Sequence, residues 1–283
     1  MYKIITKKEL NPSVTQMEIE APLVARKAKA GQFIILRVDE IGERIPLTVA
    51  GTDPERGTVK IIFQIVGATT EKLNQKQEGE AIQDFAGPLG VPTHTDGIKK
   101  VCIVGGGVGC AIAMPVAQAF HQLGADVTSI IGFRSKDLLI LEDEFQACSD
   151  RLFVMTDDGS YARAGNVTVA LKELLEAGET FDTIITIGPL IMMKFVVLTA
   201  KPYGIPVTVS MNPIMIDGTG MCGCCRLSLH QDGKVVTKFA CIDGPDFNGY
   251  EVDFDEAMSR GRMYTDFERE AHRKYCNLLK KGA

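Results

Sequence analysis

Three patterns of hydrophobic and polar positions follow one another along the chain. In the first, short β-rich runs are separated by Gly, Pro and Asp turns, and Val14–Glu20 alternates residue by residue. The other runs of this kind are Gln32–Val38, Arg44–Ala50 and Val59–Val66. Strands at this spacing predict a small all-β barrel or sandwich, and we expect a barrel over residues 1–98.

The second pattern begins near residue 99 and alternates continuous apolar runs with helix-like stretches. The helix-like stretches include Ala111–Leu123 and Val167–Ala177. The apolar runs are Val101–Val104, Val127–Ile131, Leu152–Thr156, Thr183–Ile187 and Pro206–Met211. Apolar strands that alternate with helices predict a doubly wound parallel sheet covered on both faces, an α/β unit over residues 99–211.

The third pattern, over residues 212–283, is rich in Gly, Cys and Met before it becomes charged. A hairpin is predicted at Leu227–Lys238, with its turn at Gln231-Asp232-Gly233. The tail Phe254–Lys281 is charged and helix-like. We therefore predict three units: all-β, α/β and a cysteine-rich loop region with a C-terminal helix.

Composition and charge exclude several classes of protein. The 283 residues are 45% hydrophobic, which excludes a disordered or fibrous chain. Lys and Arg number 31 against 36 Asp and Glu, a net charge of −5, so nucleic acid is not an expected partner. No apolar run approaches the roughly 20 residues of a membrane span, and no signal-peptide layout opens the sequence. We expect a cytoplasmic protein with no membrane partner.

Cysteine is the informative residue type. The chain has 8 cysteines, of which four lie within Cys222–Cys241. A tight cluster in a long chain without a signal peptide predicts metal binding or redox work rather than a disulfide scaffold. The isolated cysteines are expected to pack as small hydrophobic residues: Cys102, Cys110, Cys148 and Cys276.

The cysteine cluster fits most of a known iron–sulfur spacing. Plant-type [2Fe–2S] sites follow C-x4-C-x2-C…C, and Cys222, Cys225 and Cys241 fit the last three positions. Asp217 stands at the first position, and a carboxylate can also bind iron. Cys224 lies between Cys222 and Cys225, and we do not expect it to bind the metal. Two alternatives stay open: Asp217 as a turn residue with Cys224 or water as fourth ligand, and a tetrahedral zinc site.

A glycine-rich turn follows the first apolar run of the α/β unit. Gly105, Gly106, Gly107 and Gly109 lie between that strand and the next helix. Glycines let the backbone approach a pyrophosphate, whose charge the helix N-terminus attracts. The turn departs from G-x-G-x-x-G because its last position is Cys110. The alternative is a tight strand–helix turn without a ligand.

Three further turns follow later strands at the same predicted edge. Asp157 ends the third apolar run, and Gly188, Pro189 and Met192 follow the fourth. Open parallel sheets bind ligands at the carboxyl ends of their strands, so these residues are candidates for a nicotinamide dinucleotide site. Arg134 follows the second run, where it could contact a 2′-phosphate or be a solvated surface residue. The choice between NAD and NADP therefore stays open.

Arg44-Ile-Pro46-Leu47-Thr48 in the first unit resembles the flavin motif of the ferredoxin–NADP reductase superfamily, with one inserted Leu. Val66-Gly-Ala-Thr-Thr70 resembles its second flavin element, and Gly87-Pro-Leu-Gly the turn at its domain junction. The resemblance implies FAD, with Arg44 and Thr70 on the diphosphate. It further implies flavin contacts at Pro46, Leu47, Gln64 and Val66, and a catalytic Thr48 whose hydroxyl faces the ring near N5.

Over nearly its full length the chain resembles the iron–sulfur branch of that superfamily. This branch holds the electron-transfer subunits of dihydroorotate dehydrogenase, sulfide dehydrogenase and NADH-dependent reduced ferredoxin:NADP oxidoreductase. The resemblance implies FAD, a [2Fe–2S] cluster and NAD(H), with NADP(H) possible. It implies cytoplasmic electron transfer to a larger subunit carrying FAD and [4Fe–4S], in a heterodimer or higher assembly that reaches ferredoxin, with electron bifurcation. The alternatives are a flavin-binding redox sensor, a self-contained reductase and a zinc-stabilised structural subunit.

Overall fold

The structure, a computed structural model, describes the backbone of residues 1–281 and the side chains of residues 1–274. The side chain of Cys276, for which the sequence predicts hydrophobic packing, lies outside the described residues. No helix within the described part of the chain is long and apolar enough to span a membrane.

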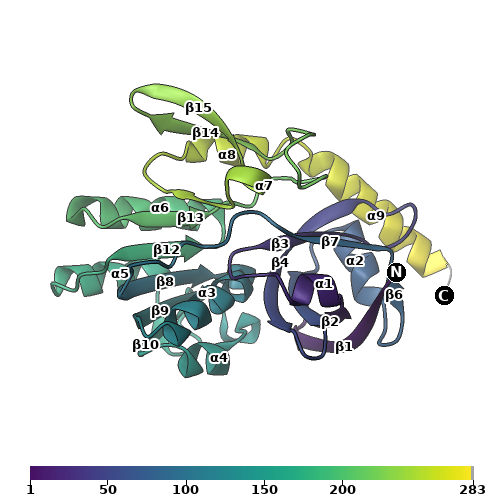
Figure 1. The fold of residues 1–283 in the computed structure, drawn as a ribbon, viewed down its shortest axis with the longest axis horizontal. Helices are drawn as coiled ribbons and strands as arrows, with labels where there is room; N and C mark the ends of the chain where they lie inside the picture. The colour runs from purple at the N-terminus through teal and green to yellow at the C-terminus, as the bar shows by residue number, and fades with distance from the viewer. Residues whose placement is uncertain (282–283) are drawn as a thin grey trace.

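Residues 2–89 form an antiparallel seven-stranded barrel sheet in the order β6-β1-β2-β5-β4-β3-β7 (Figure 1). Its strands are β1 (Tyr2–Asn11), β2 (Val14–Glu20), β3 (Phe33–Arg37), β4 (Arg44–Asp53), β5 (Thr58–Gln64), β6 (Ala81–Ile82) and β7 (Asp84–Leu89). Two helices accompany them, α1 (Pro22–Ala25) and α2 (Ala68–Gln75). Large apolar side chains fill the interior, among them Ile34, Leu36 and Phe63. The predicted barrel is therefore confirmed.

The second sheet also has seven strands, in the order β11-β10-β9-β8-β12-β13-β16. All neighbours pair in parallel except β13 and β16, which are antiparallel. The strands are β8 (Lys100–Gly106), β9 (Asp126–Phe133), β10 (Arg151–Thr156), β11 (Arg163–Ala164), β12 (Thr183–Ile187), β13 (Val207–Ser210) and β16 (Asp246–Asn248). This order, with a reversal at β8, is the predicted doubly wound sheet.

Helices cover both faces of the parallel sheet (Figure 1). Val101 and Ile103 of β8 pack with α3 (Cys110–Gln122) and α4 (Glu142–Ala147) on one face. Cys102 and Val104 pack with α5 (Val167–Glu176) and α6 (Leu190–Ala200) on the other. Successive β8 side chains point to opposite faces, so a strand buried on both is apolar throughout. Short 3₁₀ turns complete the unit: η1 (Gly107–Gly109), η2 (Lys136–Leu138) and η3 (Lys201–Tyr203).

The C-terminal region leaves the sheet and returns to it. It contains the predicted hairpin, β14 (Arg226–Gln231) and β15 (Lys234–Phe239), then α7 (Ala240–Asp243). β16 follows and joins the parallel sheet, although it lies beyond residue 211. The chain ends in α8 (Phe254–Arg260) and α9 (Thr265–Lys281), and α9 lies beside α2 of the barrel (Figure 1). The division of the chain at residues 98 and 211 stays a prediction.

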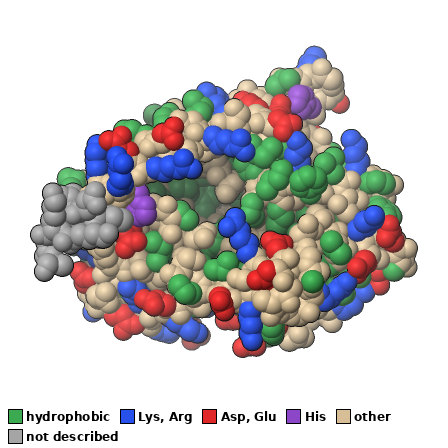
Figure 2. Space-filling model, turned by 180° about the vertical axis from the view of Figure 1, so that it is seen from behind, with side chains coloured by type: hydrophobic (Ala, Val, Ile, Leu, Met, Phe, Trp, Pro, Cys, Tyr) green, Lys and Arg blue, Asp and Glu red, His purple; other side chains and the backbone are tan. Residues whose placement is uncertain are grey.

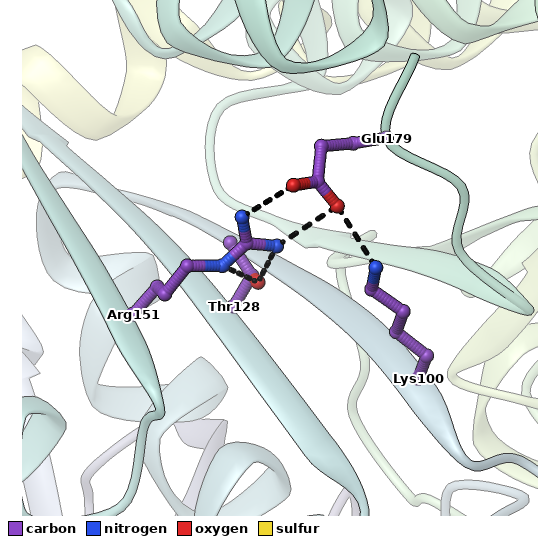
Figure 3. Close-up of polar contacts among 4 residues, drawn as sticks. All are labelled: Lys100, Thr128, Arg151 and Glu179. Carbon is purple, nitrogen blue, oxygen red and sulfur yellow. Dashed lines mark hydrogen bonds and ion pairs between the residues drawn. The ribbon is translucent and has the colours of Figure 1, made fainter. Parts of the chain in front are cut away.

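A cluster of charges ties together three parallel strands near their amino ends (Figure 3). Arg151 Nη1 lies 2.7 Å from Glu179 Oε1, and Lys100 Nζ lies 2.8 Å from Glu179 Oε2. Arg151 also donates to Thr128 Oγ1 of β9 at 3.0 Å. The Arg151 guanidinium and then Lys100 lower the pKa of Glu179 to about 2. These contacts lie at the amino ends of the strands, whereas the predicted dinucleotide residues lie at the carboxyl ends. We therefore assign this charge cluster a structural role.

Candidate functional site

Two glycine turns meet at the carboxyl edge of the parallel sheet. A Cβ atom on Gly109 would lie 2.5 Å from the carbonyl oxygen of Ile187, where β12 ends. A Cβ on Gly106 would lie 2.3 Å from the Met192 sulfur, and one on Gly188 3.1 Å from the Gly106 carbonyl oxygen. Gly106, Gly109 and Gly188 are therefore needed because the two turns touch one another, and the pyrophosphate contact predicted for Gly106 and Gly109 remains a proposal.

Gly107 is the position of the turn that stays open. Its φ is +56°, a conformation that favours glycine, and no heavy atom lies within 4 Å of a Cβ built there. Gly105 packs against Cys110, whose sulfur would lie 3.0 Å from its Cβ. The 13-residue helix α3 begins directly after this turn, so its N-terminus can favour an anion in the space beside Gly107.

The turns after β9 and β10 lie beside one another at the same edge. The Asp157 amide donates to the Phe133 carbonyl at 3.0 Å, and the Asp158 amide to the Arg134 carbonyl at 3.2 Å. Asp157 and Arg134 are both exposed. Arg134 makes no ion pair with any side chain that the structure describes. Pro189 precedes α6, so the structure brings all predicted dinucleotide residues to the sheet's carboxyl edge.

Strand β4 of the barrel presents the predicted flavin residues on two faces. Ile45 and Leu47 pack against the barrel core. Side chains alternate along a strand, so Arg44, Pro46 and Thr48 share the outer face. Arg44 is exposed and has no carboxylate partner among the described side chains, so its guanidinium is available to a ligand. Leu47 can offer only its backbone to a ligand on the outer face.

The second flavin element forms the start of α2. The Thr70 hydroxyl accepts hydrogen bonds from the amides of Val66 at 3.0 Å and Gly67 at 3.1 Å. It donates to the Gly67 carbonyl, also at 3.1 Å, and so fixes the turn that precedes the helix. Gln64 and Val66 are exposed, Val66 to 70%. Thr70 therefore shapes this turn, and its predicted diphosphate contact remains a proposal.

The barrel and the glycine turn are in direct contact. Ala50 of β4 and Ile62 of β5 share one hydrophobic cluster with Met114 and Ala117 of α3. Figure 2 shows a hollow on the rear face of the molecule, with hydrophobic side chains inside it and Lys and Arg side chains around it. Apolar walls with a positively charged border suit a ligand with a flat ring and a diphosphate.

We call residues 217–225 the cysteine loop. Together with Cys241, this loop brings the four predicted ligands into two pairs. Asp217 Oδ1 accepts from the Thr219 amide and Oδ2 from the Cys222 amide, each at 2.8 Å. These amides, Thr219 first, lower the pKa of Asp217, so its carboxylate is charged and directed toward Cys222. The second pair is Cys225 and Cys241, whose sulfurs lie 3.2 Å apart and are buried.

The surroundings of the thiols suit an iron–sulfur cluster. The Cys224 amide beside the Cys222 thiol is the main cause of its lowered pKa. Burial raises the pKa of Cys241 to about 12, and the Gly220 amide opposes that shift. Amide donors aimed at sulfur stabilise thiolates, which are the form that binds iron. No three His, Cys, Asp or Glu side chains within the described residues are grouped to hold a single metal ion. Two pairs match a two-iron cluster, in which each iron takes two protein ligands.

The cysteine loop rests on the outer face of β3, beside the predicted flavin residues. A Cβ on Gly218 would lie 2.6 Å from Leu89 and 3.0 Å from Ile35. Phe33 and Ile35 share a hydrophobic cluster with Cys225 and Cys241. In the sheet register Phe33 lies opposite Thr48 and Ile35 opposite Pro46, and opposite residues point to the same side. The flavin residues and the cysteine loop therefore occupy one face of the barrel.

Sequence reasoning missed this contact surface. It did not predict that Ile35 and Leu89 would support the loop, because their apolar character alone marks them as ordinary strand residues. The Gly87-Pro88-Leu89-Gly90 turn was the available signal, since it resembles the turn at the domain junction of the ferredoxin–NADP reductase superfamily.

A barrel joined to a doubly wound sheet with a cysteine loop between them defines the class of ferredoxin reductase-like electron-transfer proteins. Residues 212–253 match the iron–sulfur cluster binding domain of dihydroorotate dehydrogenase B. The electron transfer subunit homolog of dihydroorotate dehydrogenase B (NAD(+)) from Thermotoga maritima is 45% identical over 275 residues, covering 97% of this chain and 95% of that protein. The electron transfer subunit from Streptococcus pneumoniae R6 is 31% identical over 250 residues, covering 87% and 94%. The chain belongs to the dihydroorotate dehydrogenase B electron-transfer subunit family.

Solved structures agree with this assignment. A chain in the structure of NADH-dependent reduced ferredoxin-NADP oxidoreductase is 42% identical, with a TM-score of 0.90 and 98% of each chain covered. The cytochrome P450 reductase GcoB from Amycolatopsis, with a TM-score of 0.60 and 22% identity, shares the fold alone. The predicted fold class, the family and the cofactor set of FAD, [2Fe–2S] and NAD(H) are confirmed by these comparisons. The chain is an oxidoreductase-type electron-transfer subunit.

Proposed function

We propose that this chain is the NAD(P)H-facing subunit of a ferredoxin oxidoreductase. When bound, the flavin exchanges hydride with a nicotinamide, and the [2Fe–2S] cluster carries single electrons onward. The observation that carries the proposal is the shared face of β3 and β4, which holds the flavin residues Pro46 and Thr48 beside the cysteine loop. These residues would hold the flavin next to the cysteine loop, where it could pass electrons to a cluster bound by the loop.

Each element of the site has its own task in this proposal. Arg44 binds the flavin diphosphate, because a free guanidinium offers paired donors to phosphate oxygens. Thr48 donates a hydrogen bond to the flavin ring. The open turn at Gly107 and the N-terminus of α3 receive the dinucleotide pyrophosphate. The metal ligands are Asp217, Cys222, Cys225 and Cys241. The remaining flavin and dinucleotide contacts are Leu47 (through its backbone), Gln64, Val66, Thr70, Gly105, Gly106, Gly109, Arg134, Asp157, Gly188, Pro189 and Met192.

Exposed apolar side chains around the cysteine loop favour a partner protein. We call this set the loop rim: Ile214, Ile216, Met221 and Ile242, exposed to 40%, 45%, 89% and 48%. Exposed apolar groups gathered around an electron-transfer centre are typical of a surface that a partner covers. We propose that the occupant is a larger subunit with FAD and [4Fe–4S] clusters, in a cytoplasmic heterodimer or higher assembly. The similarity to the bifurcating oxidoreductase favours coupling among NADH, NADPH and ferredoxin.

Anaerobic rapid mixing of the holo complex with NADH tests the proposal. We expect the flavin absorbance to bleach within the turnover time and a reduced-cluster EPR signal to follow. Thr48→Val should slow bleaching without loss of flavin, whereas Thr52→Val, near the other end of β4, should leave it unchanged. Bleaching much slower than turnover would favour the redox-sensor alternative. A colourless zinc protein would reject the proposal outright.

A further inference from the structure

Two arginines donate hydrogen bonds to backbone carbonyls of the cysteine loop. Arg260 Nη2 donates to the Cys224 carbonyl at 3.3 Å, and Arg226 Nη1 donates to the Gly223 carbonyl at 3.4 Å. Arg260 is the last residue of α8 and is partly buried, whereas Arg226 is exposed at the start of β14. Arg260 therefore connects a helix 36 residues further along the chain to the centre of the loop.

The contact of Arg260 continues to a ligand sulfur. Cys224 accepts from Arg260 with its carbonyl, while its own thiol donates to the Cys222 carbonyl at 3.9 Å and its amide lies beside the Cys222 thiol. The same residue is thus held from outside and donates inward. A shift of the Arg260 side chain would release Cys224, loosen its contact with Cys222 and move its amide relative to the Cys222 thiol. Hydrogen bonds to cluster sulfurs are one of the determinants of cluster potential.

The charge of Arg260 is not offset by a carboxylate. Neither Arg260 nor Arg226 forms an ion pair with a side chain that the structure describes. Because reduction adds one negative charge to the cluster, a fixed positive charge behind the loop stabilises the reduced form more than the oxidised form.

We propose that Arg260 is a positioning residue that fixes Cys224 and raises the reduction potential of the cluster. This inference rests on the proposed cluster ligation. Loss of the guanidinium should lower the ratio of reduced to oxidised cluster at fixed potential by about tenfold, which is 59 mV for a one-electron couple.

An EPR-monitored redox titration of the holo complex tests the inference with three variants. Arg260→Gln removes the charge and keeps a shorter donor. Arg260→Lys keeps the positive charge but lacks the planar guanidinium and its paired donors. Arg262→Gln is the matched control, because it removes the same charge from an exposed residue two positions along whose side chain has no contact with the loop among those described.

We expect Arg260→Gln to titrate at lower potential, Arg260→Lys to fall between it and wild type, and Arg262→Gln to match wild type. If Arg260→Gln shifts no more than Arg262→Gln, the inference is wrong. Loss of the cluster from Arg260→Gln with retention in Arg260→Lys would support it, and loss from both would show a packing role instead. A wild-type chain without a cluster would instead refute the proposed function.

Discussion

Replacing Gly109 by Ala tests whether contact between the two glycine turns builds the dinucleotide site. The added Cβ would lie 2.5 Å from the Ile187 carbonyl oxygen and 2.7 Å from the Gly188 Cα, and both are backbone atoms that cannot rotate away. The turns must therefore separate. Overpacking of this kind costs about 1–3 kcal/mol. At about 2 kcal/mol, Tm should fall by about 4–8 °C in a chain of this size.

The functional effect should exceed the effect on stability alone. Because the β12–α6 turn would move away from the Gly107 turn, we expect KM for NADH to rise about tenfold or more, since small misplacements weaken positioning strongly. Stopped-flow reduction of the flavin over a range of NADH concentrations measures this rise, and calorimetry measures Tm.

Gly124→Ala is the matched control. Gly124 has a φ of +78° and no heavy atom within 4 Å of its Cβ position, and it lies after α3, at the opposite end of that helix from the turn. Its strain costs about 1–2 kcal/mol, so Tm should fall while the NADH dependence stays unchanged. Wild-type NADH kinetics in Gly109→Ala, or an equal KM increase in both variants, would refute the reasoning.

Three further predictions follow from the barrel, the loop rim and a buried carboxyl. Arg44→Gln should weaken FAD binding about 10- to 100-fold in equilibrium dialysis, because a charged hydrogen bond contributes about 1.5–3 kcal/mol. The control Arg56→Gln, which loses only an ion pair with Glu18, should retain FAD. Equal retention by both variants would contradict the role of Arg44. Met221→Asp should reduce co-purification of the partner about tenfold or more, whereas Leu23→Asp, also exposed, should not; an intact complex in Met221→Asp would exclude the loop rim as the interface. Burial raises the pKa of Asp246, whose Oδ1 is buried without a hydrogen-bond partner, so the folded chain keeps a proton that the unfolded chain loses. The free energy of unfolding of wild type relative to Asp246→Asn should therefore fall as pH rises from the usual Asp range through the raised pKa. A difference that stays constant with pH in denaturant titrations would contradict this.

The regular elements could be predicted because their patterns are local. Val14–Glu20 and Thr183–Ile187 form strands with the expected bounds, and the hairpin turn at Asp232-Gly233 lies where predicted. Alternation in the barrel and continuous apolar runs in the parallel sheet separate the two strand types without any tertiary information.

The relations between distant segments could not be predicted in the same way. β16 joins the sheet through pairing of Asp246–Asn248 with β13, and a three-residue strand has no pattern of its own. The packing of Gly218 against Leu89 and the contact of Arg260 with Cys224 depend on how the units meet. Gly106 and Gly109 show the same limit, because a glycine is needed wherever backbones approach, and the sequence alone does not tell whether the neighbour is a ligand or another turn.

The visible spectrum and reduced-state EPR of the anaerobically purified chain test the central claim most directly, with wild type beside Asp217→Cys and Asp217→Ala. The account predicts a flavin band and a [2Fe–2S] signal that changes in Asp217→Cys, because thiolate is a softer ligand than carboxylate. A colourless protein with about one zinc per chain would contradict the account as a whole. A cluster signal identical in all three proteins would contradict ligation by Asp217 and make Cys224 the first candidate for the fourth ligand.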